Sequence, residues 1–310
     1  MSTRLSEIDG RRLILSDLDK ALWPEARFTK GDLMEYYLDV ADGHLMPFLV
    51  NRPLSLLRSA EAASATDWLY QKTAPPGLPP WIPTRRIRTD HAALGYAEYV
   101  IGSDRAALVY LVNLGCVSHH PWNCTVDSVE KPDMLLFDLD PTEIAFREVR
   151  NAAMLVRDLL AQFKIRSWVK TSGGSGMHVM VPLEPIHTYD QVLLAAETIT
   201  RMARTREPSL FTLDMRRARR RGKILIDVHR NRRSATMISP YSVREHTPTV
   251  SAPLEWPELE RATYPEDFHV GNIRERLAQK GDPFRTFFRE RQTLTLLLES
   301  GRVRRARSGA

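Results

Sequence analysis

The stretch DMLLFDLDP, residues 133–141, places two carboxylates at the end of a strongly apolar run. The run has the length and composition of a buried strand. Because side chains alternate between faces along a strand, Asp138 and Asp140 lie on one face and Leu139 lies on the other. Pro141 cannot donate to a neighbouring strand and is expected to end this one. Two carboxylates this close favour a hard cation such as Mg²⁺ or Mn²⁺ between them; a solvated acidic strand end or a helix cap is the alternative.

Composition limits the classes of protein in which this strand can occur. The 310 residues with 43% hydrophobic content suffice for one large domain or two packed ones. A net charge of +6 permits a polyanionic partner. No apolar stretch reaches the roughly 18 residues that a membrane span needs, and the N-terminus lacks the apolar core of a signal peptide. Two cysteines do not form a disulfide framework, so we predict a reducing, cytoplasmic setting.

The order of predicted elements favours an α/β (α+β) fold. Thr29 is a good helix N-cap, with Asp32 as its capping-box partner, and apolar residues recur at helical spacing up to residue 40. We predict further helices over residues 104–114, 146–163, 189–206 and 273–300. Further strands are predicted over residues 99–101, 165–172, 177–183 and 223–229. Residues 73–83 form a proline-rich connection.

A glycine-rich turn in KTSGGSGMHVMVP, residues 170–182, separates two of these strands. Backbone N–H groups at Gly173, Gly174 and Gly176 can form an anion-binding nest. Ser172 adds a hydroxyl, and His178 can donate to a phosphate oxygen. An ordinary glycine hairpin with a histidine at the core edge remains the alternative, and the turn lacks the lysine and hydroxyl ending of a Walker motif.

The segment KILIDVHRNRRSATMISPYSVR, residues 223–244, supplies a third carboxylate. Asp227 follows an apolar strand and would complete a two-metal cage with the first two aspartates, although a salt bridge to a neighbouring arginine is the alternative. Arg244 can clamp a triphosphate through two hydrogen bonds. Three carboxylates, a glycine nest, a histidine and an arginine together suit phosphoryl transfer from a nucleoside triphosphate.

These motifs, taken in order, resemble the primase-polymerase domain of bacterial DNA ligase D, within the archaeo-eukaryotic primase superfamily. The resemblance covers about residues 15–289. It depends on DKALWPEARFTKGDLMEYY, RPLSLLR, YQKTAPPGLPPW, NLGC, HHPW, FDLDP, KTSGGSGMHVMVP and ILIDVHRN followed by YSVR. It implies a primase-like fold of mixed sheets flanked by helices, with an RRM-like catalytic core.

The resemblance also implies roles for particular residues. Asp138, Asp140 and Asp227 would hold two Mn²⁺ or Mg²⁺ ions and carry catalysis. The incoming NTP or dNTP would be bound by Ser172, Gly173, Gly174, Ser175, His178, Arg244 and His120. Lys20 and Lys30 would hold the 5′-phosphate on the far side of a gap. Further DNA contacts are expected from Arg52, Tyr70, Lys72, Arg220, Arg221 and Lys223.

The implied activity is template-directed addition of nucleotides to a primer 3′-hydroxyl, which fills short gaps in end joining or excision repair. Expected partners are DNA with 5′-phosphorylated gaps or breaks, an ATP-dependent DNA ligase and a Ku-like end-binding protein, in the cytoplasm at the bacterial nucleoid. Such enzymes often use Mn²⁺ and often favour ribonucleotides. Residues 1–300 are expected to form one domain, with an end-binding part (1–115), a catalytic core (116–300) and a basic tail (301–310).

The chain departs from the family pattern at two places. Ser175 stands where the family commonly has a lysine, so one contact to the triphosphate is absent or comes from Lys170 or Lys223. Leu69 and Tyr70 stand where the family commonly has two phenylalanines that stack on the template. No ligase or nuclease region is present, which indicates a stand-alone polymerase.

Residues 201–233 contain 12 Lys or Arg against 3 Asp or Glu, and such a basic segment favours contacts to DNA phosphates over a merely solvated loop. Cys116, His119, His120 and Cys124 offer an alternative zinc site, although buried thiols fit the compressed spacing better. Three rival functions remain: a primase that needs no primer, a metal-dependent nuclease, and a non-catalytic end-binding module that recruits a ligase.

Overall fold

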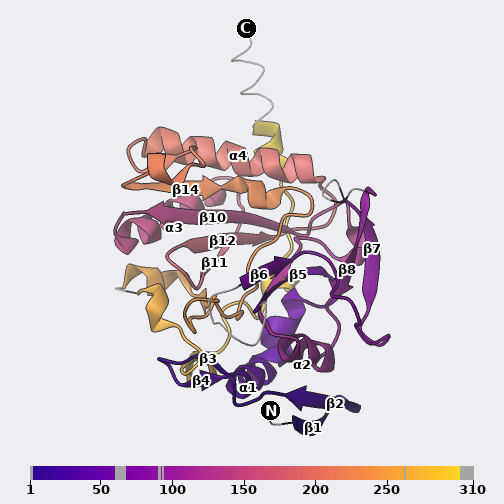
Figure 1. Cartoon of the computed structure of the whole chain (residues 1–310). Coiled ribbons are helices and arrows are strands. Elements are labelled where there is room, and N and C mark those ends of the chain that lie inside the picture. The colour runs from indigo at the N-terminus through magenta and orange to yellow at the C-terminus, as the bar shows by residue number, and fades with distance from the viewer. Residues whose placement is uncertain (1–2, 60–67, 90–91, 93, 262, 301–310) are drawn as a thin grey trace. The chain divides into compact units, whose positions relative to one another are not determined.

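The structure is a computed structural model that describes residues 3–59, 68–89, 92, 94–261 and 263–300 (Figure 1). The chain forms two compact units. Unit 1 comprises Met1–Asp127, Thr236–Ala252 and Phe268–Asp282, and unit 2 comprises Ser128–Ala235, Pro253–Asp267 and Pro283–Ala310. The expected α/β (α+β) class is confirmed, because both units combine helices with mostly antiparallel sheets.

Unit 1 is built around β5, which pairs with β6, β8 and β9. Its strands are β1 (Thr3–Ile8), β2 (Arg11–Ser16), β3 (Ala21–Trp23), β4 (Phe28–Thr29), β5 (Pro53–Ser59), β6 (Trp68–Gln71), β7 (Thr84–Arg88), β8 (Tyr96–Ile101) and β9 (Cys116–Pro121). Its helices are α1 (Lys30–Val40), η1 (Ala41–Leu45), η2 (Met46–Phe48), α2 (Arg105–Asn113) and α5 (Ile273–Lys280).

Helix α1 begins where the sequence predicts. Thr29 is the N-cap, and its hydroxyl accepts from the backbone N–H of Asp32 while the Asp32 carboxylate accepts from the N–H of Thr29. The buried face of α1 carries Tyr37, whose hydroxyl donates to the carbonyl of Val117 in β9. Local capping therefore sets the start of the helix, and a buried polar contact sets its register against the sheet.

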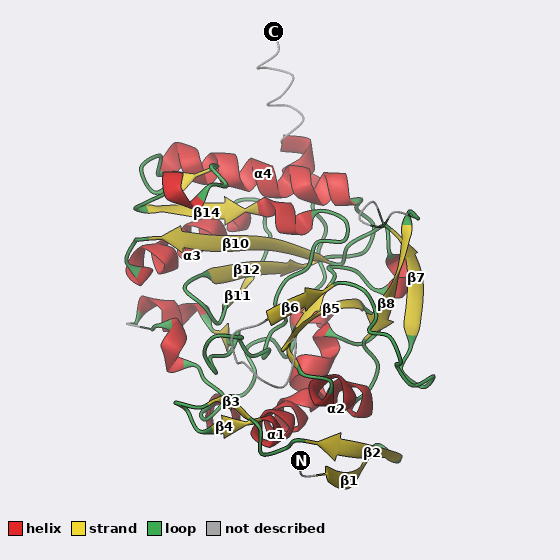
Figure 2. Ribbon diagram, in the orientation of Figure 1, coloured by secondary structure: helices red, strands yellow, loops and turns green. Residues whose placement is uncertain are grey.

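Unit 2 contains a six-stranded sheet in the order β13-β14-β10-β12-β11-β15 (Figure 2). Its strands are β10 (Met134–Thr142), β11 (Trp168–Thr171), β12 (Met177–Pro182), β13 (Phe211–Thr212), β14 (Lys223–Asp227) and β15 (Pro253–Leu254). Its helices are α3 (Phe146–Ala161), α4 (Tyr189–Arg206), η4 (Arg217–Arg219), η5 (Val228–Asn231), η6 (Trp256–Glu260), η7 (Pro265–Asp267) and η8 (Phe287–Arg289).

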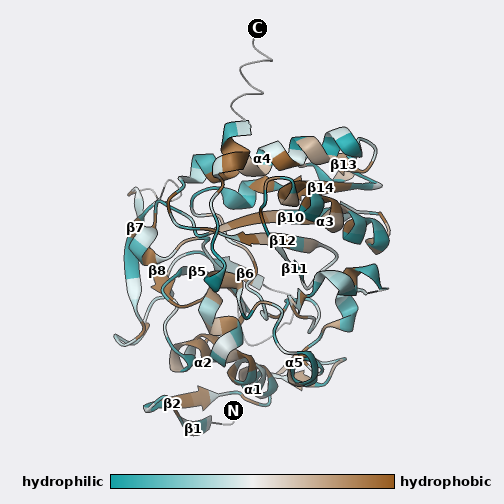
Figure 3. Cartoon of the chain, turned by 180° about the vertical axis from the view of Figure 1, so that it is seen from behind, coloured by the Kyte–Doolittle hydropathy of each residue, from teal (hydrophilic) through white to brown (hydrophobic). Residues whose placement is uncertain are grey.

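Strand β10 is the centre of unit 2. It lies between β12 and β14, and α3 and α4 contact each other and pack on the sheet. Figure 3 shows a largely hydrophobic β10, whereas hydrophobic and hydrophilic residues alternate along α3 and α4. Helices with one apolar side cover an apolar sheet face in this way.

Pro141 does not end β10, which continues to Thr142. The pairing with β12 stops at Leu139, whereas the pairing with β14 continues beyond it. Pro141 therefore lies where β10 has a neighbour on one side only, and a missing backbone donor is tolerated there.

The side chain of Asn231 extends the pairing of β10 beyond the end of β14. Its amide oxygen accepts from the N–H of Leu136 at 2.8 Å, and its amide nitrogen donates to the carbonyl of Leu136 at 2.6 Å. The same nitrogen donates to the carbonyl of Val228 at 3.0 Å. Asn231 thus ties η5, which follows Asp227, to the strand that carries Asp138.

The predicted strands and three of the predicted helices are confirmed with small shifts at their ends: α2, α3 and α4 correspond to 104–114, 146–163 and 189–206. The single helix predicted over residues 273–300 is wrong. Helix α5 stops at Lys280, where Gly281 adopts a φ of 75° and Pro283 follows. Helical structure returns only in the short η8 and over residues 295–300.

The two units do not coincide with the predicted parts 1–115 and 116–300. Strand β9 belongs to unit 1, and two later segments of the chain return to that unit. The predicted basic tail, residues 301–310, lies outside the described residues. Within the described residues, every helix is too short or too polar to cross a bilayer.

We expect Asn231→Ala to lower the free energy of unfolding by about 2–4 kcal/mol, because it leaves the buried N–H and carbonyl of Leu136 without their partners. Urea unfolding followed by circular dichroism measures this change. The control is Asn151→Ala on the exposed side of α3, which should cost less than about 0.5 kcal/mol. Equal losses in the two variants would contradict a bridging role for Asn231.

Candidate active site

Three aspartates meet on one face of the unit 2 sheet. Asp138 in β10 is the direct cross-strand partner of Asp227 in β14, and Asp140 lies two residues further along β10. Direct partners in an antiparallel pair, and residues two apart on one strand, share a face. The carboxylate side chains of Asp138, Asp140 and Asp227 are 17%, 44% and 12% exposed. The predicted convergence of strands is therefore present, and the carboxylates keep access to solvent.

Cationic side chains surround these carboxylates. The Nε of Arg230 lies 3.4 Å from an oxygen of Asp138 and 3.4 Å from an oxygen of Asp227. Nη2 of Arg220 donates to Asp140 at 2.7 Å. Arg230 thus occupies the place between two carboxylates where a counter-charge is required.

Of the three carboxylates, that of Asp138 has the most cationic side chains around it. Nε2 of His178 lies 3.4 Å from its Oδ1, and Lys170 is fully buried on β11 opposite His178. Burial alone would raise the pKa of Asp138, but the charges of His178, Arg230 and Lys170 outweigh it and lower the pKa to about 2. The carboxylate is therefore ionised at neutral pH.

The donor set suits hard divalent ions, since carboxylate oxygens are the ligands that Mg²⁺ and Mn²⁺ prefer. In the described part of the chain, however, no group of three His, Cys, Asp or Glu side chains is arranged around one point in the manner of a metal site. In this structure Arg220 and Arg230 pair with the carboxylate oxygens. Asp138, Asp140 and Asp227 fit the predicted ions in chemistry and in placement on one face.

The glycine turn between β11 and β12 differs from the predicted open nest. The N–H groups of Gly174 and Gly176 both donate to Oγ of Ser172, each at 3.2 Å. These two N–H groups therefore have their hydrogen-bond acceptor within the turn itself. Because the Ser172 oxygen accepts two hydrogen bonds, its hydroxyl proton is available as a donor. Ser172 is the hydrogen-bonding group of the turn that suits a phosphate oxygen.

Glycine is required at two positions of this turn. Gly173 has a φ of 74°, which favours a residue without a side chain. At Gly176 an added Cβ would lie 2.5 Å from the carbonyl oxygen of Leu139. The turn thus packs directly on β10, beside the aspartates. Ser175, in the same turn, is exposed.

Two predicted triphosphate ligands belong to unit 1. His120 in β9 accepts or donates at 2.9 Å to Oγ of Ser118, and its ring meets that of Tyr70 edge to face. Arg244 follows a segment that runs beside β9, since Oγ of Ser242 accepts from the N–H of His119. Its Nη1 lies 3.9 Å from Glu245. A shared role of His120 and Arg244 with Ser172 and His178 stays a prediction.

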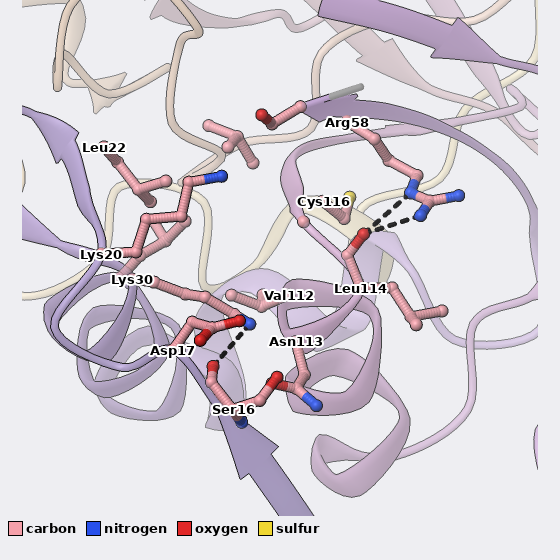
Figure 4. A pocket seen from close by; sticks show the side chains of 14 residues that line it. Ser16, Asp17, Lys20, Leu22, Lys30, Arg58, Val112, Asn113, Leu114 and Cys116 are labelled. Carbon is pink, nitrogen blue, oxygen red and sulfur yellow. Dashed lines mark hydrogen bonds between the residues drawn. The ribbon is translucent and has the colours of Figure 1, made fainter. Parts of the chain in front are cut away.

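A second candidate site lies wholly within unit 1. A cavity of about 190 Å³ is lined by both predicted 5′-phosphate ligands, Lys20 and Lys30, together with Arg58 and Asp17 (Figure 4). Nζ of Lys30 donates to the carbonyl of Ser16 at 2.7 Å. Burial lowers the pKa of Lys30, Asp17 raises it and Lys20 lowers it. The two lysines thus line one pocket, and their contact with a 5′-phosphate stays a prediction.

Two of the other predicted DNA contacts, Arg52 and Arg220, are buried in this structure. Arg52 is 2% exposed, and its Nη1 points to the carbonyl of Trp122 at 3.5 Å. Arg220 is 7% exposed and pairs with Asp140. Buried guanidinium groups with internal acceptors cannot contact DNA phosphates in this conformation.

The remaining predicted DNA contacts reach the surface. Tyr70 is 40% exposed, although its hydroxyl bonds to Thr236. Lys72 is exposed, Arg221 is exposed beside Glu143, and Lys223 is half-buried. These four residues are accessible, and their contact with DNA stays a prediction.

The alternative zinc site is not formed among the described residues. Cys116 and Cys124 are buried free thiols, and burial raises the pKa of Cys116 to about 12. Burial also lowers the pKa of His119 to about 3. A protonated thiol and a histidine on the opposite face of β9 do not bind a common ion.

The salt bridge that the sequence offered as the alternative for Asp227 is present with Arg230, whereas sequence reasoning missed Asn231. Asn231 stands four residues before Ala235 in the motif HRNRRSA, and its strand-extending contacts depend on how η5 folds back on β10. The three-residue spacing of Asp227 and Arg230 was the available signal, because it permits an ion pair within one helical turn.

A mixed sheet with three carboxylates on one face, beside a glycine turn and buried cations, defines a site of the nucleotidyltransferase class. The family model for the LigD primase-polymerase domain matches residues 29–284, and the chain therefore belongs to this family. The resemblance found in the sequence is thus confirmed.

Three curated relatives give the range of similarity. The chain is 29% identical over 284 residues to the bifunctional non-homologous end joining protein LigD of Bacillus subtilis, covering 91% of this chain and 45% of that protein. It is 30% identical over 287 residues to the multifunctional LigD of Pseudomonas aeruginosa, covering 91% and 33%. For LigD of Mycobacterium tuberculosis the values are 29% over 283 residues, 88% and 36%. The chain therefore spans between a third and a half of these relatives.

A solved structure supports the same fold. The polymerase domain of Mycobacterium tuberculosis ligase D in complex with DNA superimposes with a TM-score of 0.80 at 26% sequence identity. The match covers 91% of this chain and 99% of that one. The predicted primase-like fold is confirmed.

We predict that Asp138 stabilises the protein in a pH-dependent way. Its folded-state pKa of about 2 lies below the ordinary value of 3.8, so the unfolded chain binds the proton first as the pH falls. The contribution of Asp138 is therefore complete above about pH 4 and is lost between about pH 4 and pH 2. In Asp138→Asn this part of the acid limb should be absent.

Urea unfolding between pH 2 and pH 5 in the presence of EDTA measures this difference. Asp158→Asn, which removes an exposed carboxylate on α3, is the control and should keep the acid limb of the wild type. An unchanged slope in Asp138→Asn would show that the surrounding cations do not stabilise this carboxylate.

Proposed function

We propose that the chain is a template-directed nucleotidyltransferase that adds NTPs or dNTPs to a primer 3′-hydroxyl during repair of DNA breaks. The observation that carries this proposal is the direct cross-strand pairing of Asp138 with Asp227, with Asp140 on the same face. Membership of the LigD primase-polymerase family supports the same reaction class. Carboxylates on one sheet face can neutralise and align a triphosphate with an attacking hydroxyl.

In this proposal, some residues of unit 2 bind the ions and the nucleotide, and others compensate charge. Asp138, Asp140 and Asp227 would hold two Mn²⁺ or Mg²⁺ ions, which supply Lewis-acid stabilisation of phosphoryl oxygens when bound. The hydroxyl of Ser172 donates to a phosphate oxygen, and His178 holds Asp138 on its other side. Arg220 and Arg230 pair with these carboxylates here and would be available to anionic groups of the nucleotide if ions took their place.

The basic pocket of unit 1 gives the proposal a second part. We assign Lys20 and Lys30 to the 5′-phosphate at the far side of a gap, because a cavity with two lysines suits a terminal phosphate. The comparison structure contains DNA, and the relatives are named for non-homologous end joining. An ATP-dependent ligase and a Ku-like end-binding protein are the partners that this role requires, in the cytoplasm.

Asp138→Ala should lower primer extension at least about a hundredfold, because it removes a carboxylate that aligns the reacting phosphoryl group. The assay uses a 5′-phosphorylated gapped DNA with Mn²⁺ and with rNTPs and dNTPs in turn. Asp158→Ala on α3 is the matched control and should extend like the wild type. Normal extension by Asp138→Ala, with the fold verified by circular dichroism, would refute the catalytic assignment.

The same assay separates the rival functions. Synthesis on bare single strands without a primer would identify a primase. Loss of labelled ends without NTP would identify a nuclease. DNA binding that survives Asp140→Asn, without any incorporation by the wild type, would identify a non-catalytic end-binding module.

Lys20→Ala should weaken binding to gapped DNA with a 5′-phosphate and leave binding to the 5′-hydroxyl form unchanged. The physical reason is that Lys20 contributes one charge to the pocket and does not contact the rest of the duplex in this proposal. Fluorescence anisotropy at two salt concentrations measures the ratio of the two affinities. Lys131→Ala, an exposed lysine of unit 2, is the control and should leave this ratio at the wild-type value. An unchanged ratio in Lys20→Ala would remove the pocket from the proposal.

A further inference from the structure

The pocket assigned to the 5′-phosphate contains a carboxylate. Asp17 lines the cavity together with Lys20, Lys30 and Arg58. Figure 4 shows Asp17 beside the end of Lys30, at the side of the pocket where Ser16 lies, whereas Lys20 extends toward another part of the cavity. A carboxylate repels a phosphate dianion, so its presence in such a pocket calls for a physical reason.

The cationic side chains of the pocket differ in the hydrogen bonds that they make to protein groups. The Nε and Nη2 of Arg58 donate to the carbonyl of Leu114 at 3.0 and 2.7 Å, and its Nη1 donates to Gln71 at 2.7 Å. Nζ of Lys30 donates to the carbonyl of Ser16. Lys20 is therefore the cationic side chain with the fewest hydrogen bonds to protein groups. The guanidinium group of Arg58 is instead bonded to residues at the wall of the cavity.

Asp17 compensates a buried charge when no phosphate is present. Lys30 is 6% exposed, and an ammonium so deeply placed needs an anion nearby. The charge of Asp17 favours the protonated form of Lys30, opposing burial and Lys20. When a phosphate enters, it takes over this role, and the two anions then compete for the same ammonium.

The backbone holds Asp17 at this place. Its φ is 55°, a left-handed conformation that aspartate and asparagine adopt more readily than most residues. Its carbonyl accepts from the N–H of Lys20 at 3.0 Å, and the N–H of Gly31 in α1 donates to the carbonyl of Leu18 at 2.8 Å. Asparagine preserves this turn, so the charge can be removed without a change of shape.

We propose that Asp17 is a specificity-determining residue of the 5′-phosphate pocket, where its carboxylate weakens binding of the phosphate and speeds its release. This inference rests on the proposed function, because a repaired end must leave the polymerase before a ligase can join it. Asp17 competes with the phosphate for Lys30, so release does not require the lysines to lose their protons.

The test compares Asp17→Asn with wild type on gapped DNA that carries either a 5′-phosphate or a 5′-hydroxyl. We expect Asp17→Asn to bind the phosphorylated DNA roughly threefold to tenfold tighter, the range for a partly exposed charge acting on a dianion. Stopped-flow dissociation into excess unlabelled DNA should slow by a similar factor. Binding to the 5′-hydroxyl DNA should not change, and the gain should shrink at high salt.

Asp19→Asn is the matched control. It makes the same charge change two residues away, at an exposed position that does not line the cavity. A gain of equal size in Asp19→Asn, or a gain on both DNA ends, would show a general charge effect and overturn the inference. Unchanged or weaker binding of the phosphorylated DNA by Asp17→Asn would also overturn it.

The outcome also separates this inference from the proposed function. If wild type prefers the 5′-phosphate and Lys20→Ala loses this preference, the pocket assignment holds, and a neutral Asp17→Asn contradicts the inference alone. If wild type binds both ends equally and Lys20→Ala changes nothing, the pocket assignment fails and the inference fails with it.

Discussion

Antiparallel pairing of β10 with β14 sets Asp138 directly opposite Asp227, and like charges at such a position destabilise a sheet unless cations offset them. The cationic side chains of the unit 2 site offset this repulsion. Arg230 touches both carboxylates, and His178 and the buried Lys170 complete the compensation of Asp138. The cost of assembling the carboxylates is thus offset by cations of the protein itself.

The sequence predicted the parts of the site that depend on local periodicity. The alternation of Asp138 and Asp140 with Leu139 and the strand before Asp227 follow from a repeat of two residues, which the sheet preserves. The pairing of β10 with β14 joins segments that are far apart in the sequence, so local periodicity does not predict it. The expectation that three carboxylates share one site nevertheless indicated that these two strands lie close together. Where local signals compete, prediction failed: the apolar spacing over residues 273–300 indicated one helix, but Gly281 ends it.

Counting positive residues was a poor guide to which of them face DNA. Arg52 and Arg220 stand in basic or motif segments, but both guanidinium groups are buried against internal acceptors. Whether an arginine neutralises a carboxylate of its own chain or a phosphate of a partner depends on tertiary distances, which composition does not contain. The closed turn at Ser172 has the same origin, because composition does not show that the Ser172 hydroxyl is placed to accept from two N–H groups of its own turn.

The two candidate sites carry opposite charges, and in each of them an internal group of the other sign lies near the charged side chains. In unit 2, the carboxylates proposed to bind cations are paired with Arg220 and Arg230. In unit 1, the buried Lys30, proposed to bind an anion, lies in the same pocket as Asp17, whose charge favours its protonated form. An internal counter-ion stabilises the empty site and lowers the net affinity for the ligand, because the ligand must displace it. Under the proposed function, moderate affinity at both sites would favour release of the DNA over its retention.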